Sequence, residues 1–183
     1  MLVLAVSGSL RAQSTTSRAL DLALEGARQA GAEVRSVTLD GLGLPWCDGR
    51  PEGASYGPAV DAWRATMIGA DAIVLGSPEY HGSMSGVLKN ALDLLDKEHM
   101  QGKMIGLVAT ARGDAGAMNT LNHLRHVCRW GDAWVLPSQV SIPRAQDAFA
   151  SDGAVLREGL SAELMGLGSE LVRYARLLRG GAG

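Results

Sequence analysis

Short apolar runs that alternate with helical patterns constrain the fold of this chain more than any other feature of its sequence. The runs expected to form strands lie at residues 2–7, 33–39, 72–76, 104–110 and, interrupted by Pro137, within 133–142. Apolar residues at helical spacing predict helices over 15–30, 59–69, 83–97, 116–129 and 153–178. Because parallel strands are joined by crossover helices, this alternation predicts an α/β fold: a five-stranded, doubly wound parallel sheet in a three-layer α/β/α arrangement.

Length and composition narrow the class of protein further. A chain of 183 residues that is 46% hydrophobic predicts a single domain over residues 1–180. The net charge of −2 gives no reason to expect a nucleic acid or an anionic membrane as partner. No apolar run approaches the roughly 20 residues that cross a bilayer, and no basic residues precede the first run, so we expect a cytoplasmic protein without a signal peptide. Its two cysteines predict neither a disulfide framework nor a metal site.

The loop after the first expected strand is rich in hydroxyl groups and has no carboxylate before Asp21. Six hydroxyl groups and two arginines, Arg11 and Arg18, fall within residues 7–18. A helix N-terminus presents free N–H groups and the positive end of the helix dipole, so this loop suits one phosphate group. A hydroxyl-rich helix cap without a ligand is the alternative. The candidate contacts are Ser9, Arg11, Ser14, Thr15, Thr16 and Ser17.

The motifs of larger nucleotide sites are missing from the same region. No G-x-x-x-x-G-K-[ST] sequence supplies a lysine for a triphosphate, and no G-x-G-x-x-G sequence follows the first expected strand. Asp40 lies near the place of the acidic residue of a dinucleotide site, but the glycine pattern that would give it that role is absent. A nucleotide with a single phosphate therefore fits best.

A second loop with ligand-binding chemistry follows the third expected strand. The apolar run at 72–75 stops at Gly76-Ser77-Pro78, and a helical pattern opens at Ser83. Loops outside the carboxyl ends of strands are where open α/β sheets bind ligands. An aromatic side chain, a proline and amides freed by glycine suit a flat, hydrogen-bonding ring better than a metal. The candidate contacts here are Pro78, Glu79, Tyr80, His81, Gly82 and Ser83.

With both loops in view, the chain resembles the NADPH-dependent FMN reductase family, which includes quinone, chromate and azo-dye reductases. The most specific parts are Gly8-Ser9-Leu10-Arg11 with Ser14, and residues 78–83 with Lys89-Asn90-Ala91-Leu92-Asp93. The strand pattern agrees with a flavodoxin-like order, 2-1-3-4-5, in which FMN lies between the loops after strands 1 and 3. The resemblance covers nearly the whole chain.

The resemblance implies a role for each loop. Ser9, Arg11, Ser14 and Thr16 would hold the FMN phosphate, Pro78, Tyr80, His81 and Gly82 would line the isoalloxazine ring, and Ala111, Arg112, Gly113 and Gly116 would close its far edge. Thr16 and His81 stand where the family often has asparagine, and Arg112 stands where a small residue is typical. For Arg112 the alternatives are a partner subunit's carboxylate, solvent, or the 2′-phosphate of NADPH.

Two functions follow as hypotheses. The first is an FMN-dependent NAD(P)H oxidoreductase that transfers hydride from NADPH or NADH to bound FMN and on to a quinone-like or other small acceptor, with the flavin N5, rather than a side chain, as the reacting centre. The alternative is a flavodoxin-like electron carrier or a flavin-binding module without nicotinamide chemistry of its own. A carrier typically has a strongly acidic surface, so the net charge of −2 argues against that role. A homodimer or homotetramer is expected, because family members are usually oligomers and the helix at 83–97 has a broad apolar face. The acceptor and the preferred nicotinamide nucleotide stay open.

Overall fold

A parallel sheet forms the centre of the computed structural model, which describes residues 1–180. Its strands are β1 (Leu2–Ser7), β2 (Glu33–Thr38), β3 (Ala72–Tyr80), β5 (Met104–Thr110), β6 (Trp134–Val135) and β7 (Val140–Ile142). The order is β2-β1-β3-β5-β6, and β7 pairs with β5 beyond β6. Since β6 and β7 share the fifth position, the predicted flavodoxin-like order is confirmed.

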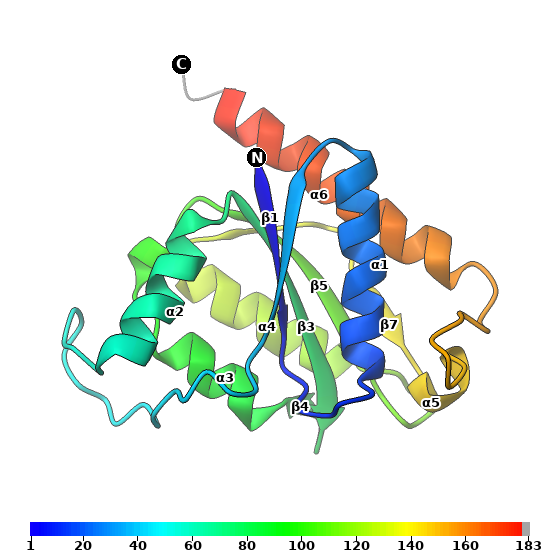
Figure 1. The fold of residues 1–183 in the computed structure, drawn as a ribbon, viewed down its shortest axis with the longest axis horizontal. Coiled ribbons are helices and arrows are strands. Elements are labelled where there is room, and N and C mark those ends of the chain that lie inside the picture. Colours follow the sequence, from blue (N-terminus) through cyan, green and yellow to red (C-terminus); the bar gives the residue numbers. More distant parts are fainter. Residues whose placement is uncertain (181–183) are drawn as a thin grey trace.

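Helices cover both faces of the sheet (Figure 1). On one face lie α1 (Thr15–Gln29) and α6 (Leu160–Gly180), and on the other lie α2 (Pro58–Gly69), α3 (Gly86–Asp93) and α4 (Met118–Trp130). Successive residues of β1 point to opposite faces: Val3 and Ala5 pack on the α1 and α6 side, whereas Leu4 and Val6 pack on the α2 and α4 side. The sheet therefore separates two hydrophobic cores.

The backbones of α1 and α6 touch where the two helices cross. A Cβ atom added to Gly26 would overlap the carbonyl oxygen of Met165, and one added to Gly168 would overlap that of Ala23. The hydroxyl of Ser169 also donates a hydrogen bond to the carbonyl oxygen of Gly26 at 3.0 Å. Because no side chain separates the helices here, α6 sets the position of α1 against the sheet.

The region after β3 differs from the expectation. β3 extends to Tyr80 instead of ending at residue 76, and it turns through His81 and Gly82 into the short strand β4 (Ser83–Met84). Both turn residues have positive φ, 52° and 76°, as the favoured two-residue hairpin turns require. α3 therefore begins at Gly86 rather than at residue 83. A 3-10 turn, η1 (Lys97–His99), follows it.

The C-terminal helix is also shorter than predicted. It begins at Leu160, not at residue 153, because Gly153 and Gly159 adopt positive φ values of 96° and 74°. Before it come the single helical turn α5 (Ala145–Ala148) and a bridge between Phe149 and Val155. Segment 143–159 thus folds back on itself instead of forming the first turns of a helix.

The broad apolar face of α3 and its flanks is buried within the chain itself. Met84, Leu88, Ala91, Leu92 and Leu95 are each 7% exposed or less. The apolar pattern therefore gives no support to our expectation of an oligomer, which stays a prediction. In the described part of the chain, no helix has both the length and the apolar composition to cross a membrane.

Candidate active site

A cavity of about 660 Å³ opens at the carboxyl edge of the sheet. Its walls are the loops after β1, β3 and β5 and the segment after β7, and its volume falls within the roughly 300–1,000 Å³ usual for ligand pockets. The loops after β1 and β3 lie side by side because these strands are neighbours. Predicted contacts that line it are Ser9, Arg11, Ser14, Thr15, Thr16, Pro78, Glu79, Tyr80, His81, Gly82, Ala111, Arg112, Gly113 and Gly116.

The loop after β1 is held by hydrogen bonds to β3 and to the residue that precedes α3. The amide of Gly8 donates to the carbonyl oxygen of Gly76 at 2.8 Å, and the hydroxyl of Ser85 donates to the carbonyl oxygen of Gly8 at 2.6 Å. A Cβ atom on Gly8 would lie 2.8 Å from both Leu88 Cβ and Ser85 Oγ. The close approach fixes the path of the chain into α1.

The first turn of α1 leaves donors for an anion. The hydroxyl of Ser14 caps the helix by accepting from the amide of Ser17 at 3.1 Å. The amides of Thr15 and Thr16 have no carbonyl to reach within the helix and no other partner among residues 1–180. Arg11 is exposed at the same place and forms no ion pair within those residues. The start of α1 is thus suited to one anionic group, because it combines two free amides, a guanidinium and the positive end of the helix dipole.

The hydroxyl of Thr16 has a structural partner. It lies 2.7 Å from the hydroxyl of Thr110, and both side chains are buried. This contact joins the start of α1 to the end of β5 beneath the cavity. The backbone amide of Thr16 is therefore left free at the cavity, whereas its hydroxyl is not.

The β3–β4 hairpin forms a second wall through Pro78, Tyr80, His81 and Gly82. The carboxylate of Glu79 accepts hydrogen bonds from the amide and the hydroxyl of Thr120, at 3.2 and 3.1 Å. Thr120 belongs to the first turn of α4, where a negative charge stabilises the helix. Glu79 thus fastens the hairpin to α4 through one carboxylate oxygen, Oε2.

The loop after β5 is fastened to β7 and α5. The amide of Ala111 donates to Ile142 at 2.9 Å, and the carbonyl oxygen of Gly113 accepts from the amide of Arg144 at 3.2 Å. Gly116 has a φ of 71°, and a Cβ atom there would lie 2.6 Å from Ser141 Oγ, whereas a Cβ atom on Gly113 would meet nothing within 4 Å. Gly116 is therefore required by the fold, and Gly113 is not.

Two predicted contacts lie outside the lining of the cavity. Ser17 shares a hydrogen bond of 2.9 Å with the hydroxyl of Ser7, and Ser83 shares one of 2.9 Å with His123 Nδ1. We therefore no longer assign either residue to the ligand.

The sequence interpretation also missed one wall. The additional lining residues are Gln13, Arg18, Thr110, Ala115, Ala145, Gln146, Phe149, Ala150 and Ser151. The guanidinium of Arg18 donates to the carbonyl oxygens of Ala150 and Ser151, at 2.6 and 3.0 Å. The sequence did contain a signal for this wall. The fifth expected strand ends at the same edge of the sheet as the others, so the segment that follows it had to pass the cavity.

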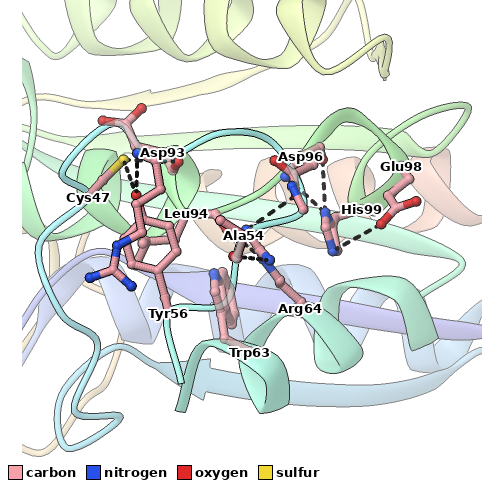
Figure 2. Close-up of polar contacts among 12 residues, drawn as sticks. Cys47, Ala54, Tyr56, Trp63, Arg64, Asp93, Leu94, Asp96, Glu98 and His99 are labelled. Carbon is pink, nitrogen blue, oxygen red and sulfur yellow. Dashed lines mark hydrogen bonds and ion pairs between the residues drawn. The ribbon is translucent and has the colours of Figure 1, made fainter. Parts of the chain in front are cut away.

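The loop over residues 40–57, which follows β2, takes no part in the lining. Figure 2 shows it bound to the end of α3 and to η1. Arg64 donates to the carbonyl oxygens of Leu94 and Ala54, at 2.9 and 3.3 Å, and pairs with Asp96 at 3.2 Å. The Tyr56 hydroxyl donates to Asp48 and lowers the pKa of that carboxyl. Within residues 1–180, no group of three or more histidine, cysteine or acidic residues could hold a metal ion.

The comparison with known families agrees with this geometry. The model of the family described as NADPH-dependent FMN reductase matches residues 1–147. The chain belongs to this family. The matched part of this FMN reductase family member contains the loops after β1, β3 and β5, and it ends within α5.

Individual relatives extend the comparison over the whole chain. The NAD(P)H-dependent FMN reductase PA1204 of Pseudomonas aeruginosa is 32% identical over 182 residues, which cover 97% of each protein. The FMN-dependent NADPH-azoreductase of Staphylococcus aureus is 34% identical over 104 residues, 53% of this chain and 55% of that protein. The flavoenzyme FerB from Paracoccus denitrificans has a similar fold, with a TM-score of 0.77 at 22% identity over 96% of this chain and 97% of that one.

The residues of the cavity fit the cofactor that the family name specifies. FMN has one phosphate, and the start of α1 offers donors for one anion. Its flat ring needs a wall with free amides, and those of Arg112 and Gly113 have no hydrogen-bond partner within residues 1–180. The open space above Gly113 and the hairpin wall opposite complete a site of that shape.

Proposed function

We propose that the cavity binds FMN, with the phosphate at the start of α1 and the ring between residues 78–82 and 111–113. The chain is an FMN-dependent NAD(P)H oxidoreductase by family, and we propose quinones or similar small oxidised molecules as its acceptors. When bound, FMN supplies the transfer of hydride between nicotinamide and acceptor. The observation that carries the proposal is the convergence on one cavity of three loops that follow neighbouring strands.

The roles of the protein groups follow from their contacts. Arg11 and the amides of Thr15 and Thr16 hold the phosphate, and Ser14 keeps that helical turn in shape. Tyr80 and Pro78 pack against the ring, while the amides of Arg112 and Gly113 donate to its polar edge, where they stabilise added negative charge. The protein orients the reactants and needs no nucleophilic side chain.

Titration with FMN tests the binding site directly. We expect saturable binding and a flavin absorbance spectrum. FAD should bind more weakly, because the start of α1 is suited to a terminal phosphate. Absence of FMN binding at micromolar protein would refute the site.

Anaerobic mixing with each nicotinamide nucleotide separates an enzyme from an electron carrier. NADPH or NADH should bleach the absorbance of bound FMN without a partner protein, and a quinone should restore it and sustain turnover. The carrier would be the correct interpretation if neither nucleotide reduced the FMN while one-electron reductants did.

Self-association is a further part of the proposal. Tyr80 and Met118, 48% and 47% exposed, are apolar side chains near the cavity that a second copy could cover. Light scattering over a range of concentrations tests this, and a mass of 19.1 kDa throughout would contradict it.

A further inference from the structure

A small hairpin, residues 148–156, forms part of the cavity wall that the sequence interpretation missed. The amide of Ala150 closes it by donating to the carbonyl oxygen of Ala154 at 2.8 Å. Its turn contains Gly153, which has a φ of 96° and donates its amide to the carbonyl oxygen of Ala150 at 3.0 Å. The match to the family model ends at residue 147, so this hairpin lies outside the part of the chain that the model describes.

The base of the hairpin is buried, whereas most of its tip is exposed. Phe149, at the base, is 5% exposed and packs into the core on the α1 and α6 side of the sheet. The tip, residues 150–154, is joined to the rest of residues 1–180 by hydrogen bonds from one side chain only. The guanidinium of Arg18 donates to the carbonyl oxygens of Ala150 and Ser151, at 2.6 and 3.0 Å. The position of the tip therefore depends on Arg18.

Arg18 lies beside the proposed phosphate site. Its amide donates to the carbonyl oxygen of Ser14 at 3.1 Å, so Arg18 follows the cap of α1 by one helical turn. Helical side chains lean toward the N-terminus of their helix, which places the guanidinium over the first turn of α1. α5 and the start of α1 lie next to each other in Figure 1, and Ser14, Arg18, Ala150 and Ser151 all line the cavity. The tip thus borders the cavity where the phosphate would lie.

The chemistry of Arg18 suits the task of holding two successive carbonyl oxygens. A guanidinium presents its N–H groups in a rigid, planar fork, so one side chain reaches both oxygens at once. A carboxylate would compete for the same N–H groups, and Arg18 forms no ion pair within residues 1–180. The fork is therefore committed to the hairpin.

We propose that Arg18 is a positioning residue of the FMN site, which acts through the hairpin and not by contact with the cofactor. By holding the tip against the start of α1, Arg18 keeps this wall closed on the ligand and slows its dissociation. A wall that is released part of the time lowers the fraction of the protein that is able to bind, and the affinity falls with that fraction. This inference rests on the proposed function, in which FMN fills the cavity.

The test uses substitutions that release the tip in different ways. Arg18→Gln removes the guanidinium, and Arg18→Lys keeps an ammonium group that can still donate to the two carbonyl oxygens. Gly153→Ala strains the turn through its positive φ and leaves Arg18 in place, because Arg18 Nε, at 4.0 Å, is the one atom near the added methyl group. Arg28→Gln is the matched control, since Arg28 lies on the same helix outside the cavity lining.

Three measurements read the role of the hairpin separately from stability. The dissociation rate of FMN is followed by flavin fluorescence. Titrations with FMN and with riboflavin, which lacks the phosphate, give the two affinities. Hydrogen exchange of residues 149–156 in the FMN-loaded protein reports on the hairpin itself, and urea unfolding identifies any general loss of stability.

The expected result is the same loss for both flavins. Arg18→Gln should speed FMN dissociation by about tenfold and weaken FMN and riboflavin by the same factor, because the tip loses charge-assisted hydrogen bonds. Hydrogen exchange in the tip should become faster. Gly153→Ala should reproduce these changes, Arg18→Lys should be intermediate, and Arg28→Gln should change none of them.

Two outcomes would overturn the inference. Weakening of FMN with unchanged riboflavin binding would make Arg18 a direct ligand of the phosphate. Unchanged binding of both flavins in Arg18→Gln would show that the hairpin does not retain the ligand. Either result leaves the proposed function standing as long as the wild-type protein binds FMN, and a wild-type protein that binds no FMN would refute that function instead.

Discussion

The 40–57 loop and the loops around the cavity leave the same edge of the sheet, yet their polar groups are used differently. The backbone of the 40–57 loop is bound by side chains of Asn90, Arg64 and Asp96, which lie outside it. Arg64 and Asp96 also pair with each other (Figure 2). Around the cavity, Arg11, Arg112 and the first amides of α1 have no such partner within residues 1–180. Buried polar groups in native proteins are nearly always paired, and the amide of the buried residue Thr16 is left without a partner here, which indicates a ligand.

This contrast means that substitutions in the two regions should affect different quantities. Around the cavity they should change ligand affinity, and in the 40–57 loop they should change the free energy of unfolding. Each variant below therefore requires both measurements.

The largest expected effect is on FMN affinity. Arg11→Ala should weaken FMN binding by about tenfold to a hundredfold, because it removes a charge-assisted hydrogen bond worth about 1.5–3 kcal/mol. Fluorescence titration measures it. Arg50→Ala is the control: Arg50 pairs with Asp48 and stacks over Tyr56 in the 40–57 loop, so its loss should leave FMN affinity unchanged. Equal effects of the two substitutions would remove the distinction between the regions.

Substitutions of the two glycines in the loop after β5 should affect different quantities, one the free energy of unfolding and the other FMN affinity. Gly116→Ala should destabilise the protein by about 1–3 kcal/mol, because it combines positive φ with a contact of 2.6 Å to Ser141. Gly113→Ala should leave the free energy of unfolding unchanged, since nothing lies near the added methyl group. Urea unfolding of the FMN-free proteins gives both values. If the ring lies where we propose, Gly113→Ala weakens FMN binding nonetheless.

The ion pair between Arg64 and Asp96, beside the 40–57 loop, should contribute to stability and not to FMN affinity. Arg64→Ala removes two hydrogen bonds and leaves Asp96, whose side chain is 15% exposed, without its partner. We expect a loss of about 1–2 kcal/mol in urea unfolding and no change in FMN affinity. Arg28→Ala, which breaks an exposed pair with Glu25 on α1, should cost less than about 1 kcal/mol. A loss of FMN binding in Arg64→Ala would show that the loop acts on the cavity after all.

The smallest effect concerns the two cysteines. Burial raises the pKa of the Cys128 thiol to about 12, whereas Cys47 is partly exposed in the 40–57 loop. Iodoacetamide at pH 8.5 should therefore modify Cys47 in the native protein and Cys128 only after unfolding, as mass spectrometry would detect. The unfolded thiol has a pKa of about 8.5, so the stability that Cys128 contributes is complete below that pH and declines as the pH rises toward 12. Cys128→Ala should remove this part of the alkaline dependence.

Local pattern predicted most of the fold. The buried strands β1 and β5 begin and end as the sequence indicated, because continuous apolar runs flanked by turn residues have few other solutions. The predicted bounds were wrong where an element ends because of its pairing with a distant segment. β3 extends to Tyr80 because β4 pairs with its end, and nothing in residues 77–80 indicates that partner.

The sequence likewise predicted part of the candidate site and missed the rest. Ser9, Arg11 and Tyr80 have the chemistry of a nucleotide site and follow strands that local pattern reveals. The wall formed by Gln146, Phe149 and Ala150 has no such chemistry, and its position depends on how segment 143–159 folds back. Ser17 and Ser83 were assigned by composition, but hydrogen bonds to Ser7 and His123 within the protein occupy them.

The crossing of α1 and α6 has a consequence for the phosphate site that we propose. The region shared with the family model ends at residue 147, whereas α6 begins at Leu160. The helix whose first turn we propose as the phosphate site is nevertheless in backbone contact with α6 at Gly168, on the far side of that boundary. A larger residue at this crossing would tilt α1 and redirect its dipole without altering any residue of the cavity. A substitution in α6, outside the part of the chain that the family model matches, should thus change the affinity of the phosphate site that we propose.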